Sequence, residues 1–361
     1  MNPSKPKRPD FILSLPIVLL LGFGMIMVST ASAPQIRDLI FNKQLVALAL
    51  GLAGLIACTL ISHQIFRKKP ILFLGLAVVL FLLIGVLFQP AVKGAHRWYH
   101  LGSFGFQPSD LAKIVLIMFT AAVASGYRDH PRPWRARLLM LVPVYVVICG
   151  LIFVQPDYGT TFIIVSIVGV MLFVAGLPWK MVFQSGLAVF VLMIGFLFTE
   201  SYRIERLRQF FDDDPHYQNK QALLAIGSGG LTGMGIGQGK QKLGYLPEPH
   251  SDFIFAHLCE ETGFLGAMTL LGCFLFLLLR GVVILQRVPD PFSQLLGAGL
   301  LLLLTGQAIA NLSVNLGLLP NKGLPLPFIS AGGTSLLLSL TMFGILLNIS
   351  RYQKPENRVI S

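Results

Sequence analysis

Charged residues are scarce in this chain of 361 residues: Asp, Glu, Lys and Arg make up 12% of it, whereas 54% is hydrophobic. Soluble domains carry about 25% charged residues, so the composition excludes an ordinary water-soluble protein. Cysteine is also rare, and the four cysteines lack the paired spacing of a metal site or a disulfide framework. The sequence contains neither a nucleotide P-loop nor a dinucleotide-binding fingerprint. These absences leave a membrane protein with no dedicated metal ligands and no nucleotide motif in its sequence.

Apolar runs of roughly 17–25 residues, each long enough to cross a bilayer as a helix, recur along the chain. We expect ten spans, at 11–32, 44–62, 71–88, 108–125, 138–154, 160–176, 181–199, 262–280, 292–317 and 336–350. The predicted fold class is therefore an all-α polytopic membrane protein. Its one large extracytoplasmic loop, 200–261, lies between spans 7 and 8. Residues 1–361 form one membrane domain in this prediction, with 1–10 and 351–361 as cytoplasmic termini.

The distribution of positive charge predicts which ends of the spans face the cytoplasm. With both termini inside, the inner segments carry sixteen Lys and Arg residues and the short outer loops carry five. Such an excess is typical of cytoplasmic loops. The net charge of +12 then reflects topology. Nucleic-acid binding is a poor interpretation, because the basic residues are dispersed and form no known binding module.

Polar residues gather at the outer ends of the predicted helices. The segment HRWYHLGSFGFQPSDLAK, residues 96–113, places Asp110 and Lys113 three apart, hence on one face of a helix. The segment QPDYGT, residues 155–160, places Asp157 in the turn between spans 5 and 6. Each of these residues has a structural alternative: Asp110 could cap a helix, Lys113 could reach the interface with its amine, and Asp157 could be a turn residue.

The large outer loop contains two further motifs. Glycines dominate 227–240, which could let backbone amides approach an anion such as pyrophosphate; a flexible loop without a ligand is the alternative. The motif LPEPHSDFIFAHLCEE, residues 246–261, places Asp252 directly before Phe253-Ile254-Phe255, which could form an apolar anchor. A carboxylate beside apolar surface gains basicity and can serve as a general base. The two glutamates that end the motif are interpreted as the polar entry to span 8, and a zinc pair of its two histidines is disfavoured by their spacing.

Four segments in order resemble the SEDS family of bacterial membrane proteins: GAHRWYHLGSFGFQPSDLAK, QPDYGT, the run from QALLAIGSGG to EETGFLGA, and NKGLPLPFISAGGTS. Within these segments, LTGMGIGQGKQKLGYLPEPH and NKGLPLPFIS look more like the division type, FtsW, than the elongation type, RodA. The resemblance implies a peptidoglycan glycosyltransferase that polymerises lipid II at the outer face of the plasma membrane, with release of undecaprenyl diphosphate and inversion.

The resemblance also implies roles for individual residues, with Asp252 as the base that accepts the hydroxyl proton. The predicted substrate-binding residues are Arg97, Asp110, Lys113, Asp157, Lys242, His250 and Lys322. The family usually has glutamate where this chain has Asp110, and tyrosine where it has Ala331. No cofactor is implied with certainty, although a divalent cation could assist the leaving group.

The expected partners are a class B penicillin-binding protein, which is a transpeptidase, and other membrane proteins of the division machinery. The expected location is the bacterial plasma (inner) membrane, at the division site, for septal wall synthesis. Three alternatives stay open: a lipid II flippase, an elongation-type polymerase and a non-catalytic scaffold. A flippase would call for charged residues at mid-membrane along a path.

Overall fold

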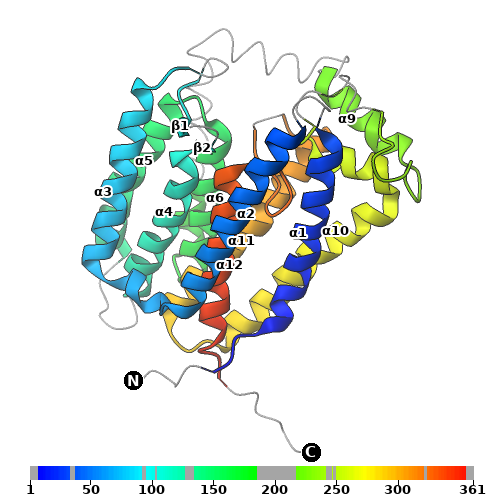
Figure 1. Cartoon of the computed structure of the whole chain (residues 1–361). Coiled ribbons are helices and arrows are strands. Elements are labelled where there is room, and N and C mark those ends of the chain that lie inside the picture. The colour runs from blue at the N-terminus through cyan, green and yellow to red at the C-terminus, as the bar shows by residue number, and fades with distance from the viewer. Residues whose placement is uncertain are drawn as a thin grey trace, which may run out of the picture.

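The computed structural model of the chain describes residues 7–32, 37–91, 95–101, 104–126, 134–184, 217–240, 246, 249–320 and 323–354. Within them the chain forms a bundle of long helices that run between two opposite ends (Figure 1). The helices are α1 (Ser14–Ala31), α2 (Arg37–Leu60), α3 (Lys69–Gly85), α4 (Pro108–Ser125), α5 (Trp134–Val154), α6 (Tyr158–Val174), α9 (Tyr217–Ser228), α10 (Ile254–Arg287), α11 (Pro291–Asn315) and α12 (Gly333–Ser350). Short 3-10 helices cover Phe11–Leu13, His63–Arg67 and Val86–Phe88, and a hairpin pairs β1 (Tyr99–Leu101) with β2 (Phe104–Phe106).

The membrane-spanning prediction is confirmed for the described residues. Eight helical segments are long and apolar enough to cross a bilayer, and α6, with 17 residues, is a shorter apolar helix. These nine coincide with nine of the ten predicted spans, whereas most of the predicted span 181–199 lies outside the described residues. Helix α10 begins eight residues before the predicted span and extends to Arg287, and it is kinked at Gly263, where φ is 66°. The chain is a multi-pass membrane protein.

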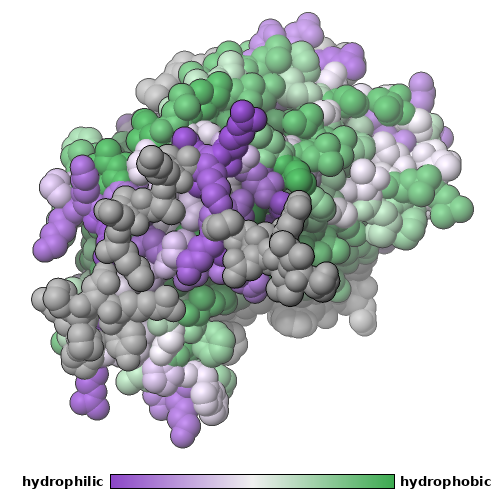
Figure 2. Space-filling model, turned by 90° about the horizontal axis from the view of Figure 1, so that it is seen from below, coloured by the Kyte–Doolittle hydropathy of each residue, from purple (hydrophilic) through white to green (hydrophobic). Residues whose placement is uncertain are grey.

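The two ends of the bundle differ in what they carry. The start of α1 and the end of α12 lie at one end, called here the terminal face, and the hairpin and α9 lie at the other, the site face (Figure 1). The terminal face displays hydrophilic side chains between apolar flanks (Figure 2). Its exposed basic residues include Lys7, Arg8, Arg67, Lys68 and Lys69. This charge agrees with the predicted cytoplasmic side, and the orientation itself stays a prediction.

Three helices form the interior of the bundle. Within the most apolar stretch of each, between 72% and 78% of the residues of α4, α11 and α12 are buried, against 17% for α2 and α3. Side chains on the interior helices meet protein in place of lipid, so polar groups there find partners that the bilayer cannot offer. The site described below is built on this interior.

At the terminal face, a buried histidine joins three helix ends. His63 Nδ1 contacts Asn348 Oδ1 of α12 at 2.7 Å, and its Nε2 contacts Ser293 Oγ of α11 at 2.6 Å. Asp290, before α11, accepts from the Ser293 amide and from the Gln64 side chain. Burial lowers the pKa of His63, against the opposing effects of Asn348 and Asp290. Burial alone would raise the pKa of Asp290, but hydrogen bonds from Ser293 and Gln64 and the charge of Arg67 hold it below its usual value.

We expect this network to make the fold less stable in mild acid. Because the folded-state pKa of His63 is lowered, its contribution to stability is complete above its unfolded pKa of about 6.5 and is lost as pH falls through the folded value. A thermal melt of the wild type should therefore drop between pH 7.5 and pH 5, and His63→Gln should remove part of that drop. His96→Gln, at an exposed histidine of the site face, is the matched control. Equal pH dependence in wild type and His63→Gln would contradict this assignment.

Candidate functional site

Asp252 lies in the turn that precedes α10, at the site face, with its side chain partly exposed. Its backbone carbonyl accepts hydrogen bonds from Asn311 Nδ2 and Asn315 Nδ2, both at 3.0 Å. A Cβ atom added to Gly323 would lie 3.8 Å from Asp252 Oδ2, so the carboxylate stands beside this glycine. The structure thus fixes the backbone of Asp252 from within the bundle and leaves its carboxylate at the surface of the site.

The predicted apolar anchor after Asp252 points into the protein. Phe253, Ile254 and Phe255 are 1%, 0% and 4% exposed. Phe253 packs in a small core of its own with α9, and Ile254 and Phe255 join the main core. Their burial stabilises the first turn of α10 and so fixes the position of the preceding aspartate.

A row of three amides on α11 supports the site, and we call Gln307, Asn311 and Asn315 the amide ladder. They are four residues apart, so they lie on one face of the helix, and each is at most 5% exposed. Gln307 Nε2 donates to the Pro325 carbonyl at 2.8 Å, and Asn311 Nδ2 donates to the Leu324 carbonyl at 2.7 Å. The ladder therefore binds two segments at once, the Asp252 turn and the chain that follows Gly323.

These two segments also bind each other. Ser330 Oγ donates to the Ser251 carbonyl at 2.6 Å, and the Ala331 amide donates to the His250 carbonyl at 2.8 Å. Asn315 Oδ1 accepts from the Ala256 amide at 3.1 Å, which ties the first turn of α10 to the end of α11. His250, a predicted substrate-binding residue, is thus held by its backbone two residues from Asp252.

The predicted pair on α4 is a buried ion pair. Lys113 Nζ lies 2.7 Å from Asp110 Oδ1, and the two side chains are 5% and 8% exposed. Lys113 Nζ also donates to Gln307 Oε1 at 3.2 Å, which joins the pair to the amide ladder. The capping role considered for Asp110 is wrong, since α4 has no side-chain cap. The amine of Lys113 is therefore engaged inside the protein, by Asp110 and Gln307.

Arg97 and Asp157 form a second group at the site face. Arg97 Nε donates to the Gln155 carbonyl at 2.8 Å, and its Nη2 donates to the Pro156 carbonyl. Asp157 is the N-cap of α6, where its Oδ1 accepts from the Thr160 amide. Asp157 Oδ2 also accepts from Gln107 and Ser109, both at 3.1 Å. These contacts are those of a structural residue in a turn, which was the alternative to substrate binding for Asp157.

The structure brings together some of the predicted site residues, and two others lie outside the described part of the chain. Asp110, Lys113 and the Asp252 turn are connected through the amide ladder, and Asp157 contacts Ser109, the neighbour of Asp110. Lys242 and Lys322 lie outside the described residues. Within the described part of the chain, no group of three or more His, Cys, Asp and Glu residues is arranged to hold a metal ion.

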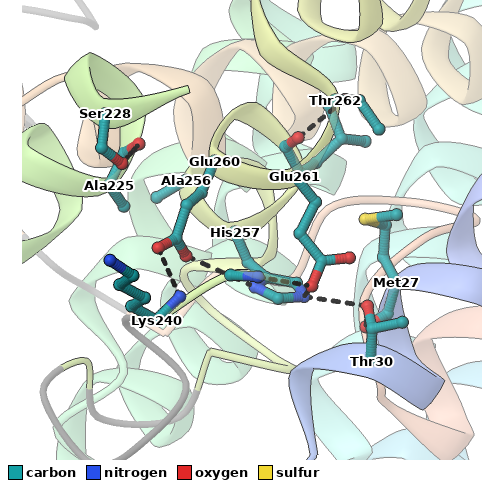
Figure 3. A network of polar contacts seen from close by, with 12 residues as sticks. Met27, Thr30, Ala225, Ser228, Lys240, Ala256, His257, Glu260, Glu261 and Thr262 are labelled. Atoms are coloured by element: carbon teal, nitrogen blue, oxygen red, sulfur yellow. Dashed lines mark hydrogen bonds and ion pairs between the residues drawn. The ribbon is translucent and has the colours of Figure 1, made fainter. Parts of the chain in front are cut away.

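A buried polar cluster lies five to nine residues after Asp252 (Figure 3). His257 Nε2 contacts Thr30 Oγ1 of α1 at 2.9 Å and Glu261 Oε1 at 3.3 Å. Glu260 Oε1 accepts from the Lys240 amide at 2.7 Å. The side chains of His257, Glu260 and Glu261 are at most 1% exposed, so Glu260 and Glu261 belong to the protein interior and do not form a polar entry to the span. The cluster links α1, the start of α10 and the end of the glycine-rich loop.

The glycines of this loop serve close packing on α10. A Cβ atom at Gly229 would lie 1.9 Å from the Cys259 carbonyl oxygen, and one at Gly233 would lie 2.1 Å from that of Glu261. The amides of Met234 and Gly235 donate to the carbonyls of Glu260 and Glu261. These carbonyls lose their helical partners at the Gly263 kink, and the loop replaces those partners. The anion-binding interpretation is therefore replaced by a structural one for Gly229 and Gly233.

The chain is similar to known proteins over nearly its whole length. Residues 11–355 match the family described as "Cell cycle protein", FTSW_RODA_SPOVE. The chain is 37% identical to "Probable peptidoglycan glycosyltransferase FtsW" of Trichlorobacter lovleyi, over 97% of this chain and 95% of that protein. It is 35% identical to "Stage V sporulation protein E" of Bacillus subtilis, over 97% and 99% of the two chains.

Solved structures share the fold over nearly the whole chain. One comes from "Structural coordination of polymerization and crosslinking by a peptidoglycan synthase complex", with a TM-score of 0.80 and 28% identity, covering 96% of this chain and 99% of that one. The rod shape determining protein RodA of Thermus thermophilus matches with a TM-score of 0.71 and 28% identity, covering 96% and 98%.

Proposed function

The chain belongs to the SEDS family of bacterial membrane proteins, that of FtsW, RodA and SpoVE, and we propose that it polymerises lipid II into peptidoglycan glycan strands. The observation that carries the proposal is the placement of Asp252. A partly exposed carboxylate stands at one face of a membrane bundle, and the amide ladder holds its backbone in place. Such support is what a group needs if it is to meet a reacting atom in a fixed geometry.

Asp252 would act as the general base. Its carboxylate accepts the proton of the 4-hydroxyl of the acceptor N-acetylglucosamine, and the oxygen attacks the anomeric carbon of the donor N-acetylmuramic acid. The new glycosidic bond forms as the bond from the anomeric carbon to the diphosphate oxygen breaks. Undecaprenyl diphosphate leaves with the bonding electrons, and the configuration at the anomeric carbon inverts. One carboxylate suffices for this displacement, because the diphosphate is a good leaving group once its charge is stabilised.

The leaving diphosphate requires positive charge near Asp252. Lys113 is paired with Asp110 and buried, so its contribution is to hold Gln307 in the amide ladder. We propose Lys322 and Lys242 for the diphosphate, since Lys322 precedes Gly323, which stands beside the Asp252 carboxylate. Arg97 would hold the hairpin and the 155–157 turn at the rim of the site. His250 would shape the sugar site through the turn that it shares with Asp252.

The setting of the reaction follows from the orientation. With the terminal face in the cytoplasm, Asp252 lies at the outer face of the plasma membrane, where lipid II is consumed. A class B penicillin-binding protein would then cross-link the strands, and the relatives named FtsW favour a role in septal wall synthesis at the division site. Other membrane proteins of the division machinery would bring the pair to that site.

Glycan-strand formation by the purified full chain with lipid II, alone and with its class B transpeptidase, tests the proposal. We expect strands in the presence of the partner, detected by gel electrophoresis of labelled product. The Asp252→Asn protein, purified in the same way, controls for contaminating polymerases. Transport of lipid II across vesicles without any polymer would favour the flippase, and absence of both activities in a complex that assembles normally would favour the scaffold.

A further inference from the structure

An apolar groove opens between α1 and α2 in the half of the bundle nearer the terminal face. It has a volume of about 310 Å³. Val18 of α1 and Ile56 of α2 line its walls, and Phe343 and Leu347 of α12 line its floor. Val18 and Ile56 are 66% and 56% exposed, so the groove is open to the bilayer.

The two walls are held apart because each is packed tightly on a different partner. In α2, a Cβ atom at Gly51 would lie 2.6 Å from Leu340 Cδ1, and one at Gly344 of α12 would lie 2.5 Å from the Leu55 carbonyl oxygen. In α1, a Cβ atom at Gly24 would lie 2.7 Å from the Phe328 carbonyl oxygen. These close contacts fix α2 on α12 and α1 on the segment before α12. The groove therefore lies between two helices that are each packed on a different neighbour.

The mouth of the groove is basic. Thr59 lines the groove, and its carbonyl accepts from Arg351 Nη1 at 3.1 Å. Arg351 also binds the backbone of Lys7, which is exposed beside Arg8. The acid of this region, Asp10, is paired with Arg280 at 2.6 Å. An excess of positive charge therefore stands where the groove meets the terminal face.

We propose that this groove binds one anionic glycerophospholipid of the leaflet at the terminal face. An acyl chain would lie between α1 and α2 on Phe343 and Leu347, and the phosphate would face Arg351 and Lys7. Basic residues next to an apolar slot are the pattern that selects an anionic headgroup.

Native mass spectrometry of the purified full chain, mixed with phosphatidylglycerol and phosphatidylcholine of matched acyl chains, tests the proposal. We expect the wild type to retain phosphatidylglycerol in preference. Val18→Trp, which fills the groove, should abolish that preference, whereas Val146→Trp on α5 should not; both valines are 66% exposed. Arg351→Gln should weaken phosphatidylglycerol binding about fivefold, the factor equivalent to ~1 kcal/mol per basic residue, and Lys354→Gln should change it less.

A thermal melt of each variant confirms that it is folded, and Ile56→Trp replaces Val18→Trp if the latter is not. Equal retention of the two lipids by the wild type would overturn the proposal. So would equal effects of Val18→Trp and Val146→Trp, which would mean that the bound lipid is general boundary lipid. Cross-linking of a partner helix to position 18 or 56 in the intact complex would assign the groove to that helix and overturn it as well.

Discussion

Replacing Asp252 by asparagine is expected to lower glycan-strand formation by about 10²–10⁴-fold, the usual cost of losing a general base. An amide keeps the size of the carboxylate but cannot accept the proton of the attacking hydroxyl. The fold should survive the change, because the amide ladder binds the backbone carbonyl of Asp252 and not its side chain. Binding of lipid II and of the transpeptidase should survive for the same reason.

The measurement compares strand formation by wild type, Asp252→Asn and Asp38→Asn, each in complex with the transpeptidase. Asp38 is an exposed acid in the first turn of α2 and serves as the matched acid-to-amide control. A thermal melt and a lipid II binding assay accompany each variant. Wild-type polymerisation by a stable Asp252→Asn protein would end the general-base assignment. A collapse of stability without a catalytic defect in the folded fraction would make Asp252 a structural residue.

Hydropathy alone predicted the membrane helices, because a bilayer admits few alternatives. Nine of the ten predicted spans coincide with helices among the described residues. A long apolar run has to satisfy its backbone groups internally, so the helix follows from composition. The same reasoning singled out Asp252, since a carboxylate in an apolar setting is costly without a purpose. Hydropathy did not predict the first residue of α10 or the kink at Gly263. Both features depend on the glycine-rich loop that packs against α10.

The amide ladder was missed, although its spacing was visible in the sequence. Gln307, Asn311 and Asn315 stand four apart in an apolar helix, which is the signal of a polar stripe on one face. The sequence does not show which groups these amides bind. The ladder binds carbonyls of Asp252, Leu324 and Pro325, and only the packing of α11 against both segments reveals this.

The cluster around His257 shows a second limit of pattern reasoning. Glutamates at the edge of an apolar run are usually exposed, and the sequence offers no sign that Glu260 and Glu261 are covered by the loop from Gly229 to Lys240. Glu260 is bound by the amide of Lys240, which lies 20 positions earlier in the chain, and His257 of the same cluster contacts Thr30 of α1. Glycines at 229 and 233 permit that approach, so the same residues that suggested an anion site serve packing.

Lys113→Met should cause the largest loss of stability among single substitutions at the site. The change leaves the Asp110 carboxylate buried and uncompensated, which typically costs about 3–5 kcal/mol when one partner of a buried ion pair is removed. The double variant Asp110→Asn/Lys113→Met contains no buried charge at this position, so we expect it to recover most of that stability. Chemical denaturation or a thermal melt of both proteins in detergent measures the difference.

The activity of the double variant shows whether Lys113 only neutralises Asp110 or also positions the site. Lys113 Nζ holds Gln307 Oε1, and Gln307 holds the segment that follows Gly323 beside Asp252. Loss of that contact should lower polymerisation about tenfold or more even when stability is restored, since a misplacement of about 1 Å can cost 10²-fold. The deficit should fall on kcat more than on KM, and Lys113→Arg, which keeps the charge and a donor, should restore part of it. If the stable double variant polymerises lipid II like the wild type, Lys113 serves only to neutralise Asp110.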